Sequence, residues 1–499
     1  MIQGIDYAAV APPLILAAAA LALLVADAFG VPRRVLGWAS GGAFGAALVA
    51  VAALAFGDRR ATFCVPGGLR GGGPASCSYV ADDFTLVFQG VVLVAAVIVV
   101  LLSLGEITAS RIPAGEYHFL LLCAVTGAVT LVAARDLVLL VVALETLSLP
   151  VFALVALRRY DGVASEAAVK LFLVSVVSSA VMLFGVSLVY GATGAMHLDR
   201  IAPALRSLPS DLDPVAGVGI MLVLAGFAFK IAAVPFHFWA PDVYQGAPLP
   251  VAAFLSVVSK AAGFAGLAIV LALGFPAYGH VWGPLVGIMA ALTMTLGNLF
   301  ALRQTTAIRL LAWSSVAQSG YMLAPLAAGD HRLGEAVAAT TAYVALYAVM
   351  NLGAFAVVVG FRRRFEPAGE GTPPVDALDD YRGLGRRSPA AGAALAFFLI
   401  CLAGLPPGVM GLFAKVVVFR ATVAGGVTWL AVIMALNTVI GLVYYLRWAV
   451  RLYAAPTGHA YAAAVPGVPV RAAVAAAGAG AVVLSAAPQL VLQAVSSVT

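Results

Sequence analysis

The chain has 499 residues, of which 63% are hydrophobic and 10% are charged, and its formal net charge is +6. Soluble domains carry about a quarter charged residues, so this composition excludes an ordinary soluble domain. The basic residues are scattered among loops without interleaved aromatics, which argues against nucleic-acid binding. Apolar runs long enough to cross a bilayer recur throughout, and the short alternating segments of a membrane barrel do not dominate. The fold class is therefore an all-α polytopic membrane protein whose surroundings are the lipid bilayer.

Taken in chain order, the apolar runs predict about 14 transmembrane helices, with ends placed to within about 2–4 residues. They lie at 8–29, 35–56, 83–103, 118–134, 137–157, 166–191, 213–233, 249–273, 282–301, 305–328, 334–360, 390–419, 427–449 and 471–494. The first run has no Lys or Arg before it and no small-residue cleavage site after it, so we expect a retained helix rather than a signal peptide. The longest polar link is Arg362–Pro389.

The arginines predict the orientation of the chain in the membrane. With the N-terminus outside, sixteen arginines fall on the cytoplasmic side and eight on the outer side. The positive-inside rule then favours both termini on the outer side. This orientation places "CVPGGLRGGGPASC" outside, where Cys64 and Cys77 could form a disulfide in an oxidising compartment. Two free thiols are the alternative.

Lysine occurs only four times, at Lys170, Lys230, Lys260 and Lys415, each within an apolar run or its first turns. Arginine stays protonated in proteins, whereas burial can lower a lysine pKa by up to about 3–5 units, which suits lysine to carrying protons inside a membrane. The alternative is structural: a lysine near a helix end can extend its amine to the interface. Glu166, four residues before Lys170, also suits a surface ion pair. A mid-bilayer lysine costs about 2.5–3.5 kcal/mol and usually faces a cavity, a partner or a pathway, so Lys230 and Lys260 are the strongest candidates.

Glu145 is the only carboxylate near the middle of a predicted span, so we expect it to be the negative partner of a buried lysine. His237 follows Lys230 by seven residues, about two helical turns, and could relay protons between this lysine and the cytoplasm. A hydrogen-bonded interfacial histidine is the alternative. The serine-rich stretches 175–180 and 256–260 could hold internal water or could pack helices together.

Prolines interrupt two of the predicted spans. Pro235 follows Lys230, and Pro406–Pro407 precede Lys415. Proline removes a helical hydrogen bond, and irregular backbone at membrane depth is tolerated where it is buried in protein or lines a cavity. Residues 118–273 and 282–449 each hold five predicted helices, and the fourth helix of each set is the interrupted one that carries a lysine. This layout predicts two inverted five-helix repeats with discontinuous helices. Residues 1–117 would add three helices, and 450–499 the last one.

Four motifs resemble those of a known family. They are "KIAAVPFHFWAPDVYQGAPLPVAAFLSVVSKAAGF", "ALETLSLPVFAL", "RLLAWSSVAQSGYML" and "LAGLPPGVMGLFAKVVVF". Together they resemble the antiporter-like subunits of respiratory complex I and of multisubunit cation/proton antiporters, over nearly the whole chain. The resemblance implies 14 helices, two inverted units, a Glu145–Lys230 pair, a central Lys260 and an exit-side Lys415. A lysine at position 415, with no long lateral helix after the fourteenth span, is typical of the branch called subunit N.

The resemblance implies a proton-translocating subunit of an NADH:quinone oxidoreductase in a bacterial plasma membrane. No glycine-rich nucleotide motif, Cys/His cluster or haem pair is evident, and we expect no cofactor in this chain. NADH, FMN, iron–sulfur clusters and quinone would bind to other membrane and peripheral subunits. Two alternatives remain, a subunit of a stand-alone sodium/proton antiporter and a structural scaffold with passive charges.

Overall fold

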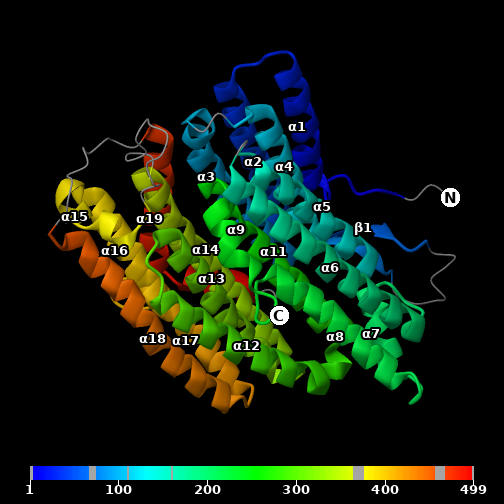
Figure 1. The fold of residues 1–499 in the computed structure, drawn as a ribbon. Coiled ribbons are helices and arrows are strands. Elements are labelled where there is room, and N and C mark those ends of the chain that lie inside the picture. Colours follow the sequence, from blue (N-terminus) through cyan, green and yellow to red (C-terminus); the bar gives the residue numbers. More distant parts are fainter. Residues whose placement is uncertain are drawn as a thin grey trace.

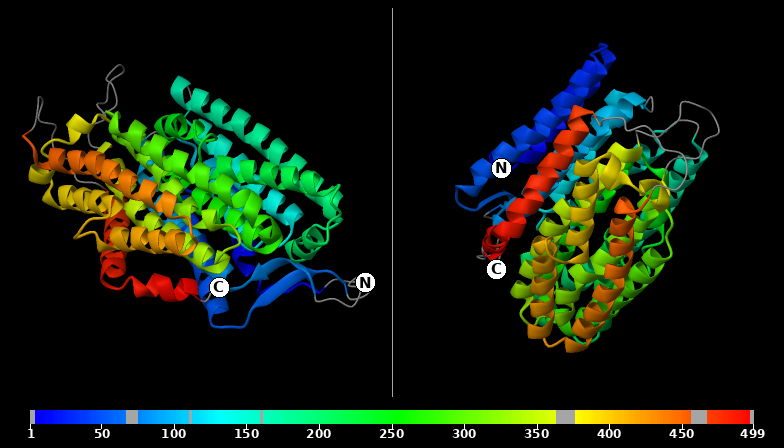
Figure 2. Two further views of the ribbon diagram at one scale, coloured as in Figure 1. Left: turned by 90° about the horizontal axis from the view of Figure 1, so that it is seen from below. Right: turned by 90° about the vertical axis from the view of Figure 1, so that its left-hand side faces the viewer.

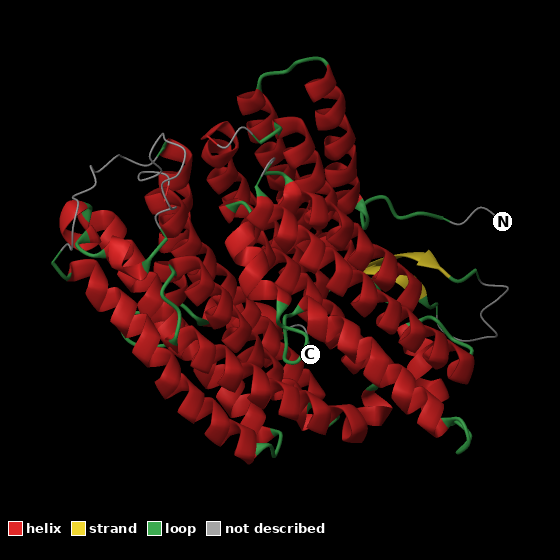
Figure 3. Ribbon diagram, viewed as in Figure 1, coloured by secondary structure: helices red, strands yellow, loops and turns green. Residues whose placement is uncertain are grey.

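The structure is a computed structural model that describes residues 4–66, 75–109, 112–158, 161–362, 376–455 and 467–496. Figures 1 and 3 show a bundle of long, obliquely running helices. Within the described residues, 12 helices are long and apolar enough to cross a membrane. Of the other two predicted spans, one forms the 17-residue helix α13 and one is divided between α16 and α17. The predicted all-α polytopic class is confirmed.

The elements follow the predicted order. The first three spans are α1 (Ala11–Ala28), α2 (Arg33–Ala55) and α3 (Asp83–Ala109). The next five are α4 (Ala114–Leu131), α5 (Leu137–Ala156), α6 (Gly162–Thr193), α8 (Asp213–Lys230) with the short α9 (Trp239–Gly246), and a continuous stretch of α10 (Leu249–Phe254), η2 (Leu255–Ser259), α11 (Lys260–Ile269) and η3 (Val270–Gly274). The following five are α12 (Gly279–Leu302), α13 (Ala307–Leu323), α14 (Leu333–Arg362), α16 (Pro389–Ala403) with α17 (Val409–Ala424), and α18 (Thr428–Tyr453). The division into repeats of five stays a prediction.

The last helices, α19 (Val468–Ala486) and α20 (Gln489–Ser496), return to pack beside α3 (Figure 2). The predicted span 471–494 is therefore wrong as one helix, because the backbone leaves the helix between Ala486 and Gln489. The predicted end of the third span at 103 is also too early, since α3 continues to Ala109. Residues 363–375 of the predicted polar link lie outside the described residues, and its described part forms η6 (Leu378–Tyr381) and α15 (Leu384–Arg387).

The short helix between α6 and α8 was not predicted. α7 (Leu198–Arg206) connects α6 to α8 and buries Leu198, Ile201 and Leu205. These apolar residues recur at spacings of three and four, which is the pattern of an amphipathic helix. Because α7 has only nine residues, the 20-residue criterion for a spanning helix passes over it.

Polar side chains begin two of the spanning helices. The Asp136 side chain accepts a hydrogen bond from the backbone N–H of Leu139 and starts α5, and Asp161 starts α6 in the same way. Such N-caps satisfy backbone donors that the helix itself leaves free. Gly194, with a φ of 65°, ends α6 in the left-handed conformation that glycine adopts without strain.

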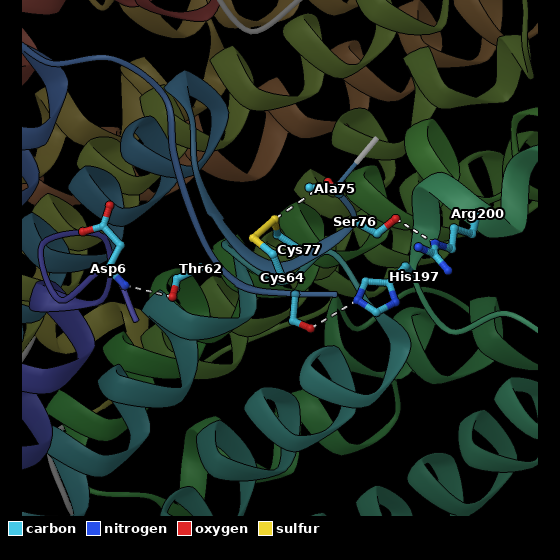
Figure 4. Close-up of a disulfide and its surroundings, with 9 residues drawn as sticks. Asp6, Thr62, Cys64, Ala75, Ser76, Cys77, His197 and Arg200 are labelled. Atoms are coloured by element: carbon cyan, nitrogen blue, oxygen red, sulfur yellow. Dashed lines mark hydrogen bonds between the residues drawn. A yellow bond between two sulfur atoms is a disulfide. The ribbon is translucent and has the colours of Figure 1, made fainter. Parts of the chain in front are cut away.

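The only strands in the described chain form a hairpin between α2 and α3, which was not predicted. β1 (Arg60–Cys64) pairs antiparallel with β2 (Cys77–Ala81), with Thr62 opposite Tyr79. A disulfide joins Cys64 to Cys77 (Figure 4). On either side of it, Thr62 Oγ1 accepts from the Asp6 N–H at 3.1 Å, and Arg200 Nε donates to Ser76 Oγ at 2.9 Å.

The hairpin is bound to the link between α4 and α5. The backbone N–H of Arg135 donates to Ser78 O at 2.8 Å, and that of Val80 donates to Ala133 O at 3.0 Å. Arg135 Nη2 also lies 2.8 Å from Asp82 Oδ2. Burial opposes the ionisation of Asp82, but the attraction of Arg135 and the bond from the Thr85 N–H outweigh it and hold the pKa of Asp82 below its ordinary value of 3.8.

The interior of the bundle is formed by the spans that are apolar on all sides. Every residue from Leu249 to Leu271 is buried inside the chain. The most apolar 18-residue segment of α14 is 89% buried, whereas those of α1 and α19 are only 22% buried. A helix that is hydrophobic all round needs protein on every side. The buried stretch carries Lys260, so one of the four lysines lies in the centre of the bundle.

Candidate functional site

Three of the four lysines are buried inside the bundle. Lys230, Lys260 and Lys415 are 8%, 2% and 6% exposed. Among the described residues none of them forms an ion pair, and their amines are bonded to hydroxyl and carbonyl oxygens instead. Keeping an ionisable group at membrane depth is costly, so its presence points to a functional site.

Lys230 and Glu145 are connected through serines. Lys230 Nζ donates to Ser148 Oγ at 2.5 Å and lies 3.4 Å from Ser175 Oγ. Ser179 Oγ donates to Glu145 Oε1 at 2.5 Å. Glu145 and Ser148 lie about one turn apart on α5, as do Ser175 and Ser179 on α6. Ser148, Ser175 and Ser179 therefore form a serine layer that contacts both the amine and the carboxylate, and the Glu145–Lys230 pair that the resemblance implies stays a prediction.

The backbone is irregular immediately after Lys230. α8 ends at this residue, and Ala232 adopts a φ of 54°, in the left-handed region that residues with a side chain rarely occupy. Polar side chains from the neighbouring helices bond the freed backbone groups. Thr293 Oγ1 accepts from the Val234 N–H at 2.9 Å, and Ser319 Oγ donates to Ile231 O at 2.7 Å. This is how broken helices at membrane depth remain satisfied.

His237 lies within this break. The prediction that it lies two helical turns after Lys230 is wrong, because the helix ends at Lys230 and the seven-residue spacing no longer measures helical turns. The His237 ring lies 5.4 Å from the ring of Trp313, and its Nδ1 is buried without a hydrogen-bond partner among the described residues.

Lys260 lies where the central span changes from π-helix to α-helix. Lys260 Nζ donates to both the carbonyl oxygen and the hydroxyl of Ser315 on α13, each at 2.6 Å. Tyr347 OH of α14 donates to the same Ser315 hydroxyl at 2.8 Å. Short π-helical segments inside α-helices often occur at functional sites.

Lys415 lies beside the second break. Its Nζ donates at 2.6 Å to the carbonyl oxygen of Ala403, the last residue of α16. Helix C-termini carry free carbonyls and partial negative charge, which favours a cation there. Gly404, with a φ of 81°, turns the chain away from α16. Lys415 also lines a cavity of about 570 Å³ bounded by α17 and α18.

One helix, α13, connects the surroundings of all three buried lysines. Ser315 binds Lys260, and Ser319 binds the carbonyl oxygen next to Lys230. Gln318 Nε2 lies 3.4 Å from Leu402 O, and the following carbonyl, of Ala403, binds Lys415.

The polar lining between Lys260 and Lys415 was missed by the sequence analysis. Tyr343 OH donates to Gln318 Oε1 at 2.5 Å, and Gln318 Nε2 donates to Tyr445 OH at 3.2 Å. The Lys415 amine lies 5.5 Å from the ring centre of Tyr321. A tyrosine in an apolar run resembles a packing residue, so the sequence gives no signal that its hydroxyl lies in a polar lining. The spacing of Ser315, Gln318 and Ser319 on one face of "SSVAQS" could have revealed this polar face.

Lys170 lies apart from the buried lysines. It is exposed near the start of α6 and forms ion pairs with Glu166 at 2.7 Å and Asp242 at 3.0 Å. Asp242 also pairs with Arg309 of α13 at 3.2 Å. No group of three or more His, Cys, Asp or Glu side chains that could hold a metal ion occurs in the described part of the chain.

Comparisons with known proteins agree with this architecture. A family model described as "NADH:quinone oxidoreductase/Mrp antiporter, TM" matches residues 134–441. The chain is 55% identical over 466 residues to NADH-quinone oxidoreductase subunit N 2 of Streptomyces griseus subsp. griseus, covering 92% of this chain and 84% of that protein. It is 46% identical over 466 residues to NADH-quinone oxidoreductase subunit N of Salinispora tropica, covering 90% and 85%.

Solved structures show the same fold. A chain of respiratory complex I from Thermus thermophilus with bound aureothin superposes with a TM-score of 0.79 and 32% identity, covering 97% of this chain and 99% of that one. A chain of the Mrp complex from Dietzia sp. DQ12-45-1b gives a TM-score of 0.82 at 20% identity, covering 98% and 96%, which shows the fold alone.

The spanning bundle, its two broken helices and its buried lysines define an antiporter-like membrane subunit of a larger complex. The chain belongs to the NADH:quinone oxidoreductase/Mrp antiporter transmembrane family, as a subunit N of complex I.

Proposed function

We propose that this chain translocates protons across the membrane through Glu145, Lys230, Lys260 and Lys415, coupled to quinone reduction elsewhere in complex I. The observation that carries the proposal is that polar groups of α13 bind Lys260 directly, the carbonyl oxygen that follows Lys230, and the carbonyl oxygen that precedes the one bound by Lys415. Hydroxyls and amides in such a chain can both donate and accept, so they suit stepwise proton transfer.

The Glu145–Lys230 pair is the first part of the proposed relay. Ser148 accepts from the Lys230 amine while its own hydroxyl donates to Leu144 O at 2.5 Å, so this serine stabilises the ammonium form. Rotation of these serine side chains would allow the Glu145 carboxylate to approach the Lys230 amine or to move away from it. The irregular backbone after Lys230 provides the freedom for such a movement.

The second part of the relay leads from Lys260 to Lys415. Ser315, Gln318 and the tyrosine hydroxyls line this part, with internal water completing it, and Lys415 releases the proton towards the cavity at α17 and α18. His237, in the break after Lys230, would serve on the cytoplasmic side. We place Lys170 outside the relay, as a surface anchor between α6 and α9.

The chain itself performs no redox chemistry in this proposal. NADH, FMN, the iron–sulfur clusters and quinone are bound by partner membrane and peripheral subunits. The proposed location is the bacterial plasma membrane, with both termini on the outer side.

The test is Lys230→Arg in the assembled complex, reconstituted into vesicles. Arginine keeps the charge but does not deprotonate, so quinone-coupled proton pumping should be lost while the complex still assembles. Lys170→Arg is the matched control, because it repeats the substitution at an exposed, ion-paired lysine. Wild-type pumping in Lys230→Arg would refute the relay. Dependence of pumping on sodium would favour the antiporter alternative, and loss of assembly alone would favour the scaffold.

A further inference from the structure

An apolar groove lies at one end of the bundle, away from the buried lysines. It has a volume of about 420 Å³ and is enclosed by the C-terminal end of α14, by α15 and the start of α16, and by the first turns of α19. Its walls are formed mainly by apolar side chains, among them Val357, Phe361, Leu384, Val470 and Val474. Cavities of this size hold a single small ligand or one flexible chain.

The mouth of the groove is basic. Arg471, in the first turn of α19, lines the groove, is exposed, and forms no ion pair with a described residue. Arg386, two residues after the lining residue Leu384 on α15, is exposed and has no ion pair within the described chain, but it does not itself line the groove. Ser388 adds a hydroxyl to the lining, and no Asp or Glu belongs to it. The described rim therefore carries positive charge without a neutralising carboxylate.

We propose that this groove binds an anionic phospholipid, with one acyl chain between α14, α16 and α19 and the phosphate on Arg471. The apolar walls alone would accept the tail of any lipid. Arg471 decides between lipids, because a guanidinium binds phosphate through paired hydrogen bonds and basic pockets between spanning helices select anionic head groups. The arginine distribution assigns this end of the bundle to the cytoplasmic side, where the leaflet carries anionic lipid.

A helix of a neighbouring subunit is the competing occupant. It would cover the apolar walls equally well but would bury Arg471, and a buried charge without a partner is strongly unfavourable. A lipid would cover the apolar walls with its acyl chain and pair its phosphate with Arg471. The occupant can therefore be identified by measuring whether lipid binding in the groove depends on the charge of the head group.

The experiment uses the intact complex in vesicles that contain photoreactive phosphatidylglycerol with a diazirine in its acyl chain. A parallel sample contains phosphatidylcholine with the same photoreactive chain. After illumination, labelled peptides are mapped by mass spectrometry. We expect labels on residues 356–361 and 470–475, with phosphatidylglycerol favoured.

Two variants and a control separate the contributions of charge and shape. Arg471→Gln should lower phosphatidylglycerol labelling about fivefold and leave phosphatidylcholine labelling unchanged. Arg447→Gln is the control, because Arg447 is another exposed arginine without an ion pair among the described residues, on α18 and outside the groove lining. Ala391→Trp fills the groove and should lower labelling by both lipids.

Three results would overturn the proposal. They are equal labelling by both lipids, unchanged phosphatidylglycerol labelling in Arg471→Gln, and absence of label from the groove peptides, which would indicate a protein occupant. Competition by unlabelled phosphatidylglycerol on the wild-type complex keeps the test valid if a variant fails to assemble: an unchanged labelling level would again overturn the proposal.

Discussion

Ser148, which accepts a hydrogen bond from Lys230, offers a quantitative test of the relay. Ser148 Oγ accepts from Lys230 Nζ at 2.5 Å, and Ser175 Oγ lies farther away, at 3.4 Å. Ser148→Ala removes the closer acceptor of a buried amine and changes no charge. We expect this substitution to destabilise the ammonium form of Lys230 and so to slow proton transfer through this lysine.

The structure allows the size of this effect to be worked out. A hydrogen bond to a charged group contributes about 1.5–3 kcal/mol. Because Ser175 remains within reach of Lys230, we take the lower end, about 1.5 kcal/mol, which corresponds to about a tenfold loss of rate. Ser148→Ala/Ser175→Ala removes both acceptors and should lose more than the single variant.

The assay is quinone-coupled acidification of vesicles that contain the purified complex, normalised to its subunit content. Thr146→Ala is the control, because Thr146 lies on the same helix and donates only to the backbone oxygen of Val142, at 2.8 Å. It should pump as the wild type does. Wild-type rates in both serine variants would refute the reasoning, since Lys230 would then not depend on these hydroxyls.

Three further predictions concern other parts of the chain. Tyr347→Phe removes the donor to the Ser315 hydroxyl, worth about 0.5–1.5 kcal/mol, and should slow pumping by up to about tenfold without loss of assembly in the same vesicle assay. Replacing Cys64 and Cys77 by serine should destabilise the hairpin by about 3 kcal/mol, seen as faster proteolysis of the hairpin, while pumping persists. The pKa of Asp82 is depressed below its ordinary value of 3.8, so its ion pair with Arg135 stabilises the hairpin fully above that pH. This contribution is lost as the pH falls through the lower folded pKa. Asp82→Asn should therefore remove the acid-induced increase in hairpin proteolysis, and an unchanged pH profile would contradict this assignment.

The sequence was sufficient to place the spanning helices along the chain, because the length of an apolar run has a direct physical meaning in a bilayer. It also located both breaks, since Pro235 and Pro406–Pro407 cannot continue a helical ladder. The hairpin and α7 were not predicted because they lie outside the apolar runs and are too short to meet the criterion for a spanning helix.

The candidate site was predictable only where a residue type is rare at membrane depth. Four lysines and one central carboxylate stand out in an apolar sequence, whereas Tyr343, Tyr347 and Tyr445 do not. The bonds that these tyrosines form cross between helices, over separations of 25 residues from Tyr343 to Gln318 and 127 residues from Gln318 to Tyr445. Such contacts depend on how the helices pack, and no local spacing encodes them.

The two broken helices hold their lysines in different ways, and the difference bears on the direction of transfer. Lys230 is the last residue of the helical segment before the first break, and its amine is bonded to serine hydroxyls that can rotate. Lys415 lies in the segment after the second break, and its amine is bonded to a fixed backbone carbonyl beside a cavity. Rotatable partners suit a step that is switched by Glu145, whereas a fixed partner at a helix C-terminus holds a charge in place until water removes the proton. If the relay operates in this way, Glu145→Gln should change the rate at which Lys230 exchanges its proton while leaving exchange at Lys415 unaffected when quinone turnover is blocked. Equal changes at both lysines would show that the two breaks act as a single unit.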